Sequence, residues 1–267
     1  PAHAPPADAA VPAAPPIITR AQWGADESIR LASCPEGPSY ATPTLAVVHH
    51  TDTSNGDSPA QSYATVRSIY VYYVQGRGYC DHGYNFLIDR FGQIFEGRYG
   101  GVDRGVIGAH ATNFNAGSIG VALIGDHSSV RPSAAAVSSL VRLLQWKMTI
   151  HVIDPSVSVP THNTVVDPVI GHRDAGAISG DGTECPGNAL YALLPSIRAW
   201  LRVPALLLAT PALAGLLGGL PLGAQSWLGG VWLGGAAGLM LADGVLSAGQ
   251  AIFGTVGGIL AGLIGAA

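Results

Sequence analysis

Charged side chains are scarce in this sequence, and neither sign of charge dominates. Only 11% of the 267 residues are Asp, Glu, Lys or Arg, and 13 basic residues stand against 17 acidic ones. A nucleic-acid-binding protein needs a basic face that pairs with phosphates, and a formal net charge of -4 provides none. Nucleic acid is therefore excluded as a partner.

Cysteine is equally sparse. The chain has three cysteines, Cys34, Cys80 and Cys185, and no two of them form a Cys-x-x-Cys pair. A structural zinc site closed by four protein ligands usually draws on such pairs, so none is expected here.

The chain also begins at Pro1 without a methionine, which suggests a trimmed product whose targeting peptide, if it had one, is absent from this numbering.

Composition divides the chain into three regions. Residues 1–16 are almost all Ala and Pro, which bury too little side chain to fold, so they are predicted to form an extended linker. Residues 17–202 mix periodic apolar segments with turn residues over the length of one domain. Residues 203–267 are rich in Gly, Ala and Leu and contain a single charged residue, Asp243. This apolar tail needs an explanation of its own.

Lipid is one explanation for the apolar tail, because so much exposed apolar surface would aggregate in water. Residues 222–242 and 244–266 each approach the roughly 20 apolar residues that span a bilayer. Glycines recur in both stretches at four-residue spacing, which lets membrane helices pack closely. Residues 222–266 are therefore predicted to form a membrane-associated helical pair. The alternative is a low-complexity tail that stays disordered or self-associates without lipid.

The pattern of residues 17–202 is typical of an α/β fold. Short runs of β-forming residues span 44–50, 83–89, 92–98 and 118–125. A hairpin turn around Gly92 is predicted to join the second run to the third. Helices are predicted over 58–75, 131–151 and 188–201. A central mixed β-sheet flanked by helices accommodates all of these segments.

Histidine is the residue type that points to chemistry. His49 and His50 end the apolar run "VVHHT", and alternation along a strand sends them to opposite faces. His172 ends another apolar strand, and a Gly-rich loop is predicted to lead from it to Cys185. His49, His172 and Cys185 would give zinc three ligands and leave a fourth position open, as in a catalytic site. The alternative is a buried thiol and two hydrogen-bonded histidines.

Five segments of the chain, in this order, resemble one known family. They are "RAQWGADESIR", "VVHHT", "CDHGYNFLIDRFGQIFEGR", "GAHATNFNAGSIGVALIGD" and "GHRD…TECPG". The family comprises the peptidoglycan recognition proteins and N-acetylmuramoyl-L-alanine amidases, phage lysozyme-amidases included, and the resemblance covers residues 17–202. It implies the fold of these proteins, with His49, His172 and Cys185 as zinc ligands.

The resemblance also implies an activity. It implies zinc-dependent hydrolysis of the amide bond between the lactyl group of N-acetylmuramic acid and L-alanine in peptidoglycan, with water activated by the metal. Tyr84 matches the family's catalytic tyrosine, and Thr183 lies two residues before the cysteine ligand, where relatives have threonine or lysine. Either hydroxyl would donate a hydrogen bond to the oxyanion that forms.

Three further residues are expected to contact the muropeptide. His110 matches a position that lines the groove of the family. Asn115 and Arg104 are polar and lie on predicted loops, where they would contact substrate or face water. His82 is a departure, because relatives usually have an aliphatic residue at that position.

Two other functions compete with that of a zinc amidase. The first is a non-catalytic peptidoglycan (muropeptide) binding module, since some relatives keep the groove without the metal. Binding-only relatives typically lack the cysteine ligand, which this chain retains as Cys185. The second is a cysteine hydrolase that uses Cys185 and His172, which is disfavoured because no third residue is evident to orient the pair.

The remaining cysteines indicate an oxidising compartment. If Cys185 binds metal, Cys34 and Cys80 are left to form a disulfide, which would close a loop of about 46 residues and add on the order of 4 kcal/mol of stability. Two buried thiols are the alternative. A secreted or cell-envelope location, with the apolar tail as a membrane tether, agrees with both a disulfide and a peptidoglycan substrate.

Overall fold

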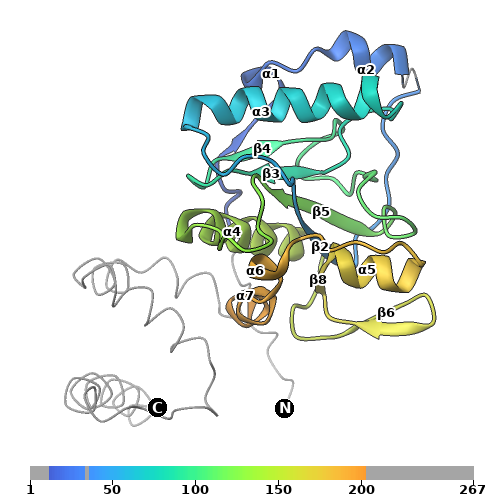
Figure 1. The fold of residues 1–267 in the computed structure, drawn as a ribbon. Coiled ribbons are helices and arrows are strands. Elements are labelled where there is room, and N and C mark those ends of the chain that lie inside the picture. The colour runs from blue at the N-terminus through green and yellow to red at the C-terminus, as the bar shows by residue number, and fades with distance from the viewer. Residues whose placement is uncertain (1–11, 34–35, 203–267) are drawn as a thin grey trace, which may run out of the picture. The chain divides into compact units, whose positions relative to one another are not determined.

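The computed structural model describes residues 12–33 and 36–202. Within them, a mixed β-sheet is covered by helices on both faces, which confirms the predicted α/β class (Figure 1). The strands are β1 (Ile17–Ile18), β2 (Leu45–His50), β3 (Phe86–Ile88), β4 (Ile94–Glu96), β5 (Ser118–Leu123), β6 (Val159–Thr161), β7 (Thr164–Val166) and β8 (Val169–Gly171). The helices are α1 (Arg20–Trp23), α2 (Glu27–Ser33), α3 (Pro59–Val71), the π-helix η1 (Tyr72–Gly76), α4 (Ala134–Ile150), α5 (His172–Ser179), α6 (Asn188–Tyr191) and α7 (Leu194–Leu201).

The main sheet has the strand order β1-β4-β3-β5-β2-β8. The β3–β4 pair is antiparallel and turns at Gly92, where φ is 83°, so the predicted hairpin is confirmed. The other pairs in this sheet are parallel. β6 and β7 form a separate antiparallel pair that the sequence did not predict.

Local sequence explains where the helices begin and break. Ser58 caps α3, because its hydroxyl accepts from the Gln61 N–H while the Gln61 side chain accepts from the Ser58 N–H. The last predicted helix, over 188–201, is divided into α6 and α7. Pro195 stands in the first turn of α7, where its missing N–H is tolerated, whereas a continuous helix would need that donor.

The apolar core lies on both faces of the sheet. On one face, Leu140 and Leu144 of α4 and Ile197 of α7 pack in one cluster with Val48 and Val121 of the sheet. Figure 1 shows α4 on this face and α3 on the opposite one. The opposite face has two further clusters, of which one packs against α1 and α3 and the other against α5. The side chains that alternate along β2 therefore enter different environments.

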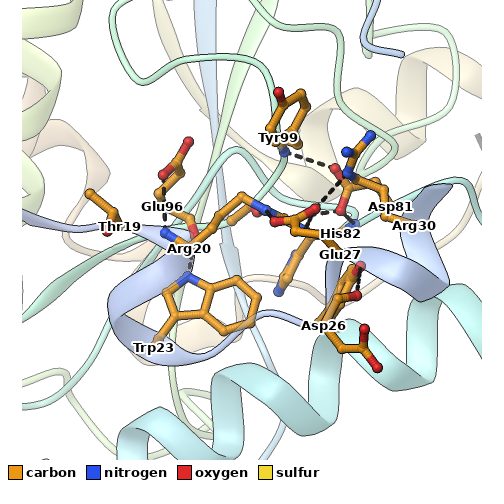
Figure 2. A network of polar contacts seen from close by, with 12 residues as sticks. Thr19, Arg20, Trp23, Asp26, Glu27, Arg30, Asp81, His82, Glu96 and Tyr99 are labelled. Carbon is orange, nitrogen blue, oxygen red and sulfur yellow. Dashed lines mark hydrogen bonds and ion pairs between the residues drawn. The ribbon is translucent and has the colours of Figure 1, made fainter. Parts of the chain in front are cut away.

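A buried ionic network joins the N-terminal helices α1 and α2 to the segments around the sheet (Figure 2). Arg20 is 4% exposed, and its guanidinium donates to Glu27 (2.7 Å), to Asp81 (3.0 Å) and to the carbonyl of Gly97. The indole N–H of Trp23 donates to the carbonyl of Glu96 (2.7 Å). The "RAQWG" motif is thus a packing and hydrogen-bonding element.

Asp81 is the centre of this network. Besides pairing with Arg20, its carboxylate accepts from the N–H groups of His82 (2.7 Å) and Tyr99 (2.8 Å). Figure 2 shows these donors converging on the one carboxylate. Because Tyr84 follows three residues later, the network fixes the backbone that carries this predicted catalytic side chain.

Several predictions concern residues outside the described part of the chain. They include the membrane-associated pair at 222–266, the rest of the 203–267 tail, and most of the 1–16 linker. Cys34 also lies outside it, so the Cys34–Cys80 disulfide stays a prediction; Cys80 Sγ lies 3.6 Å from the carbonyl oxygen of Ser33. Across 12–33 and 36–202, no helix combines the length and apolarity needed to cross a bilayer.

Replacing Arg20 by leucine should destabilise the domain by about 3–5 kcal/mol, because it leaves the buried Asp81 carboxylate without its cation. Urea unfolding of the full chain, followed by circular dichroism, measures this change. Arg131→Leu, at an exposed position before α4, is the matched control and should change stability by no more than about 0.5 kcal/mol. Equal effects of the two substitutions would contradict the role given to the network.

Candidate metal centre

Two parallel strands bring the predicted histidine ligands together. β8 pairs with β2 so that Gly171 lies opposite Val48. His49 and His172 follow these two residues directly, and the centroids of their rings are 4.5 Å apart. Parallel strands present their carboxyl ends at one edge of the sheet, where ligands usually bind in α/β folds.

Cys185 returns to this edge through a helix and a short loop. α5 begins at His172, so the prediction of a Gly-rich loop over the whole stretch to Cys185 is wrong for its first half. The Asp174 carboxylate stabilises the helix start by accepting from the Gly171 N–H (2.8 Å). After the loop, the carbonyl of Cys185 accepts from the Arg173 N–H (2.7 Å), which anchors the returning chain.

The geometry of the three side chains suits zinc. The potential ligand atoms of His49, His172 and Cys185 all lie within 4.8 Å of one another, and Cys185 Sγ is 3.7 Å from His49 Nδ1. Tetrahedral zinc with Zn–N and Zn–S bonds of about 2.0 and 2.3 Å separates its ligand atoms by roughly 3.5 Å. Two imidazoles and one thiol are also donors that zinc accepts, so the residues present fit this metal.

Burial favours the uncharged form of all three side chains. It lowers the pKa of His49 well below the usual range and also lowers the pKa of His172. It raises the pKa of the Cys185 thiol to about 12. Neutral imidazole is the form that binds metal, and a thiolate at this position needs a cation beside it.

Two hydroxyl groups border the predicted ligands. The ring of Tyr84 lies 5.0 Å from that of His49, centroid to centroid, and its hydroxyl donates to the carbonyl of His50 at 3.4 Å. Burial raises the pKa of Tyr84 well above its usual value, so the hydroxyl keeps its proton. The Thr183 hydroxyl accepts from the Cys185 N–H (3.2 Å), which leaves its own proton for another acceptor.

Tyr73 also borders the site, although the sequence did not single it out. It lies in η1, and its ring packs edge-on against Tyr84 with centroids 5.7 Å apart. Burial raises the pKa of Tyr73 to about 12, so this hydroxyl is also protonated. The α-helical period could not reveal the contact, because the π-helical turn changes which side chains share a face.

The three predicted substrate-contact residues have different surroundings. His110 is 7% exposed, and its Nδ1 lies 3.0 Å from His49 Nε2. Asn115 Oδ1 accepts from the N–H groups of His110 (2.6 Å) and of the next residue (2.9 Å). Arg104 is exposed and stacks on the ring of Tyr40 while donating to its hydroxyl (2.7 Å). Their contact with a muropeptide stays a prediction.

His50 faces away from the three predicted ligands, as alternation along β2 predicts. Its Nδ1 accepts from the His127 N–H (3.1 Å) and lies 3.7 Å from Asp126. His50, Asp52 and Asp126 form a second group whose potential ligand atoms lie within 4.8 Å of one another. The bond from His127 already uses the Nδ1 lone pair, so this group is a weaker metal site than the first.

A comparison with protein families decides the family. The sequence profile described as N-acetylmuramoyl-L-alanine amidase matches residues 39–188, more than half of the chain. The chain belongs to the N-acetylmuramoyl-L-alanine amidase family. All of the predicted site residues lie inside the matched segment of this family member.

Individual relatives of this amidase-family chain agree with that result. It is 31% identical over 185 residues to peptidoglycan-recognition protein SC2 of Drosophila melanogaster, covering 69% of this chain and 85% of the relative. It is 30% identical over 188 residues to peptidoglycan recognition protein 1 of Bos taurus, covering 70% and 86%. The structure of Drosophila PGRP-LB matches with a TM-score of 0.53 at 27% identity, covering 68% of this chain and 93% of the other. The predicted family resemblance is confirmed.

His82, where relatives were expected to have an aliphatic residue, is fully buried behind Tyr84. Its Nδ1 accepts from the Tyr84 N–H (3.3 Å), and its Nε2 has no hydrogen-bond partner among the described residues. Burial, aided by the positive charges of Arg20 and Arg98, lowers the pKa of His82 to about 3. The folded amidase domain therefore holds this imidazole in its neutral form.

This amidase-family chain should lose stability in mild acid partly through His82. The unfolded chain takes up a proton on this residue below pH 6.5 and the folded chain does not until about pH 3, so stability falls as pH falls through that window. At about 1.4 kcal/mol per pH unit, His82 should account for about 2 kcal/mol between pH 6.5 and 5. Urea unfolding across this range should show a shallower decline for His82→Leu than for the native chain. If the stability of the native chain and of His82→Leu declined in parallel, the folded native chain would bind a proton on His82 as readily as the unfolded chain does.

Proposed function

We propose that the chain is a zinc-dependent N-acetylmuramoyl-L-alanine amidase. The reaction is hydrolysis of the amide bond between the lactyl group of N-acetylmuramic acid and L-alanine in peptidoglycan. The observation that carries the proposal is the convergence of His49, His172 and Cys185 within 4.8 Å, with Tyr84 packed against His49. Family membership alone does not separate an enzyme from a binding protein, whereas a complete set of ligands beside a protonated hydroxyl favours the enzyme.

His49, His172 and Cys185 would hold the metal in this proposal. Bound zinc would polarise the scissile carbonyl and lower the pKa of water at its open position to roughly 7. The chain contributes two neutral imidazoles and one thiol that burial keeps protonated until a cation arrives. Because metal binding releases the thiol proton, Cys185 acts as a ligand and not as the nucleophile.

Tyr84 and Thr183 supply hydrogen bonds to the reacting carbonyl. As water adds to the lactyl carbonyl, its oxygen gains negative charge and needs donors at about 3 Å. The Tyr84 hydroxyl keeps its proton, and its present bond to the His50 carbonyl is long at 3.4 Å, so exchanging this acceptor for an oxyanion is favourable. Thr183 lies two residues before Cys185 and offers a second hydroxyl proton.

Peptidoglycan fragments are the proposed ligands. Peptidoglycan recognition protein LE, 26% identical and matching with a TM-score of 0.53, was solved in complex with tracheal cytotoxin, a monomeric diaminopimelic acid-type peptidoglycan. A human PGRP-Iβ domain, 25% identical with a TM-score of 0.53, was solved with a muramyl pentapeptide. In this chain His110, Asn115 and Arg104 are the predicted contacts to such a fragment, and a secreted or cell-envelope location follows from a murein substrate.

A non-catalytic muropeptide-binding module is the second candidate, because the relatives in the comparisons are named for peptidoglycan recognition. Digestion of purified peptidoglycan with and without a chelator, followed by mass analysis, separates the possibilities. Release of L-alanine-led peptides that stops with chelator supports the amidase. Binding without release from the zinc-loaded chain supports the binding module, and release that survives chelation supports a cysteine hydrolase.

Cys185→Ser and His172→Ala should each abolish hydrolysis and most zinc binding, because a site with three protein ligands cannot spare one. Zinc content of the purified variants and peptide release from peptidoglycan measure the two effects. His162→Asn, at an exposed histidine in the β6–β7 turn, is the control and should retain both. Full activity with zinc retained in either ligand variant would overturn the site.

Tyr84→Phe should retain zinc but lower kcat on the order of a hundredfold, because it removes one hydroxyl donor and leaves the ring packing intact. Tyr72→Phe removes a hydroxyl from an exposed neighbour in η1 and should leave kcat unchanged. Loss of zinc from Tyr84→Phe would mean that this hydroxyl supports the metal site and not the reaction.

A further inference from the structure

We infer that His110 is a positioning residue that sets the tautomer of the predicted zinc ligand His49. The inference rests on the proposed function, since it concerns how this chain prepares His49 for a metal. It differs from the substrate contact that the sequence predicts for His110. It is carried by a chain of hydrogen bonds whose direction is fixed at its far end.

The direction of these hydrogen bonds follows from a backbone carbonyl, which can only accept. Ser118 Oγ lies 2.5 Å from the carbonyl oxygen of Phe114, so the serine hydroxyl donates to it. The Ser118 oxygen is then an acceptor for His110 Nε2, 3.4 Å away. A neutral imidazole has one N–H, so placing it on Nε2 leaves Nδ1 of His110 as a bare acceptor.

The last link reaches the metal centre. The bare His110 Nδ1 lies 3.0 Å from His49 Nε2, which must therefore carry the proton of His49. His49 Nδ1 is left with its lone pair, and this is the atom that lies 3.7 Å from Cys185 Sγ. The relay from Phe114 through Ser118 and His110 thus presents the correct nitrogen of His49 to the site. A hydrogen bond to the second nitrogen of a metal-binding histidine is a general way to fix its tautomer and orientation.

The fold makes a slot for the His110 ring. A Cβ placed on Gly120, inside β5, would lie 2.3 Å from His110 Cδ2, and one placed on Gly108 would lie 2.4 Å from the same atom. Glycine in a strand interior weakens the strand and often marks a close approach by another group. Here the two glycines let the imidazole lie directly on the sheet beside His49, which is 1% exposed. No side chain at either position could be added without moving the ring.

The loop that carries His110 is held by Asn115. Its Oδ1 accepts from the His110 N–H and from the next N–H, which fixes the backbone that carries the ring. Since both rings are buried, water cannot easily replace His110 as the acceptor for His49 Nε2–H. Without that acceptor, the tautomer with the proton on Nδ1 becomes populated, and that form cannot bind zinc through Nδ1.

The tautomer of His49 can be measured without following the hydrolysis reaction. In the full chain with 15N-labelled histidine, stripped of metal with a chelator, the ring nitrogen shifts of His49 should report an N–H on Nε2 and a bare Nδ1. His110→Leu should yield a mixture of tautomers and weaken zinc binding about 10- to 100-fold in a competition assay with a coloured chelator. His110→Asn, whose Oδ1 can stand near the place of Nδ1, should restore the single tautomer and most of the affinity.

Ser118→Ala keeps the inference testable if His110→Leu does not fold. It removes only the hydroxyl that orients His110, so both histidines should show mixed tautomers while circular dichroism stays native. A single Nε2–H tautomer of His49 with native zinc affinity in His110→Leu or Ser118→Ala would overturn the inference. So would a His110→Leu variant that changes only KM for muropeptide, the outcome expected of a substrate contact. Failure of the proposed function is distinguishable, because the native chain would then release no peptide from peptidoglycan whatever its histidine tautomers.

Discussion

The parallel pairing of β2 with β8 is the constraint on which the candidate metal centre depends. It places Gly171 opposite Val48, and the next residue along the chain is a histidine in both segments, so His49 and His172 meet at the same edge of the sheet. A shift of the register by one residue would bring His50 to the place of His49. It would also turn every side chain of β2 to the opposite face of the sheet. The apolar residues on the two faces of β2 oppose such a shift, because they belong to different core clusters.

Desolvation organises the chemistry at this edge. The imidazoles are neutral and the thiol is protonated, so the folded chain avoids burying an isolated charge. A divalent cation beside Cys185 favours the thiolate over the thiol. The site therefore loses the thiol proton as it binds the metal. The same desolvation strengthens the polar contacts around His49, where a relay of neutral groups takes the place that a carboxylate often fills.

The sequence predicted the features that depend on local pattern. The short runs of β-forming residues gave β2, β3, β4 and β5, and the turn at Gly92 joined two of them. The three ligand candidates came from residue type and from motifs in a fixed order, and they do converge. The α5 helix was missed because Gly176 within it and Gly171, Gly180 and Gly182 beside it favour a loop, whereas the Asp174 carboxylate and packing against the sheet override that preference.

Features that depend on distant contacts could not be read from the sequence. The acceptor of the His49 N–H lies 61 positions away, and Gly120 alone looks like any strand glycine until the His110 ring is placed on it. Asp81 is likewise buried and paired with Arg20, also 61 positions away. No periodicity records such pairs, because they arise from how segments cross in space.

The ionic network around Arg20 also bears on how this domain can be recombined in evolution or by engineering. The segment that the amidase-family profile matches begins at residue 39 and ends at residue 188. Arg20 and Trp23 precede it, and Ile197 and Leu201 of the core follow it. A chimera that exchanged only residues 39–188 would inherit a buried aspartate without its arginine and a sheet face without its last helix. The unit of exchange is therefore set by the folding contacts and is longer than the segment that the family profile matches.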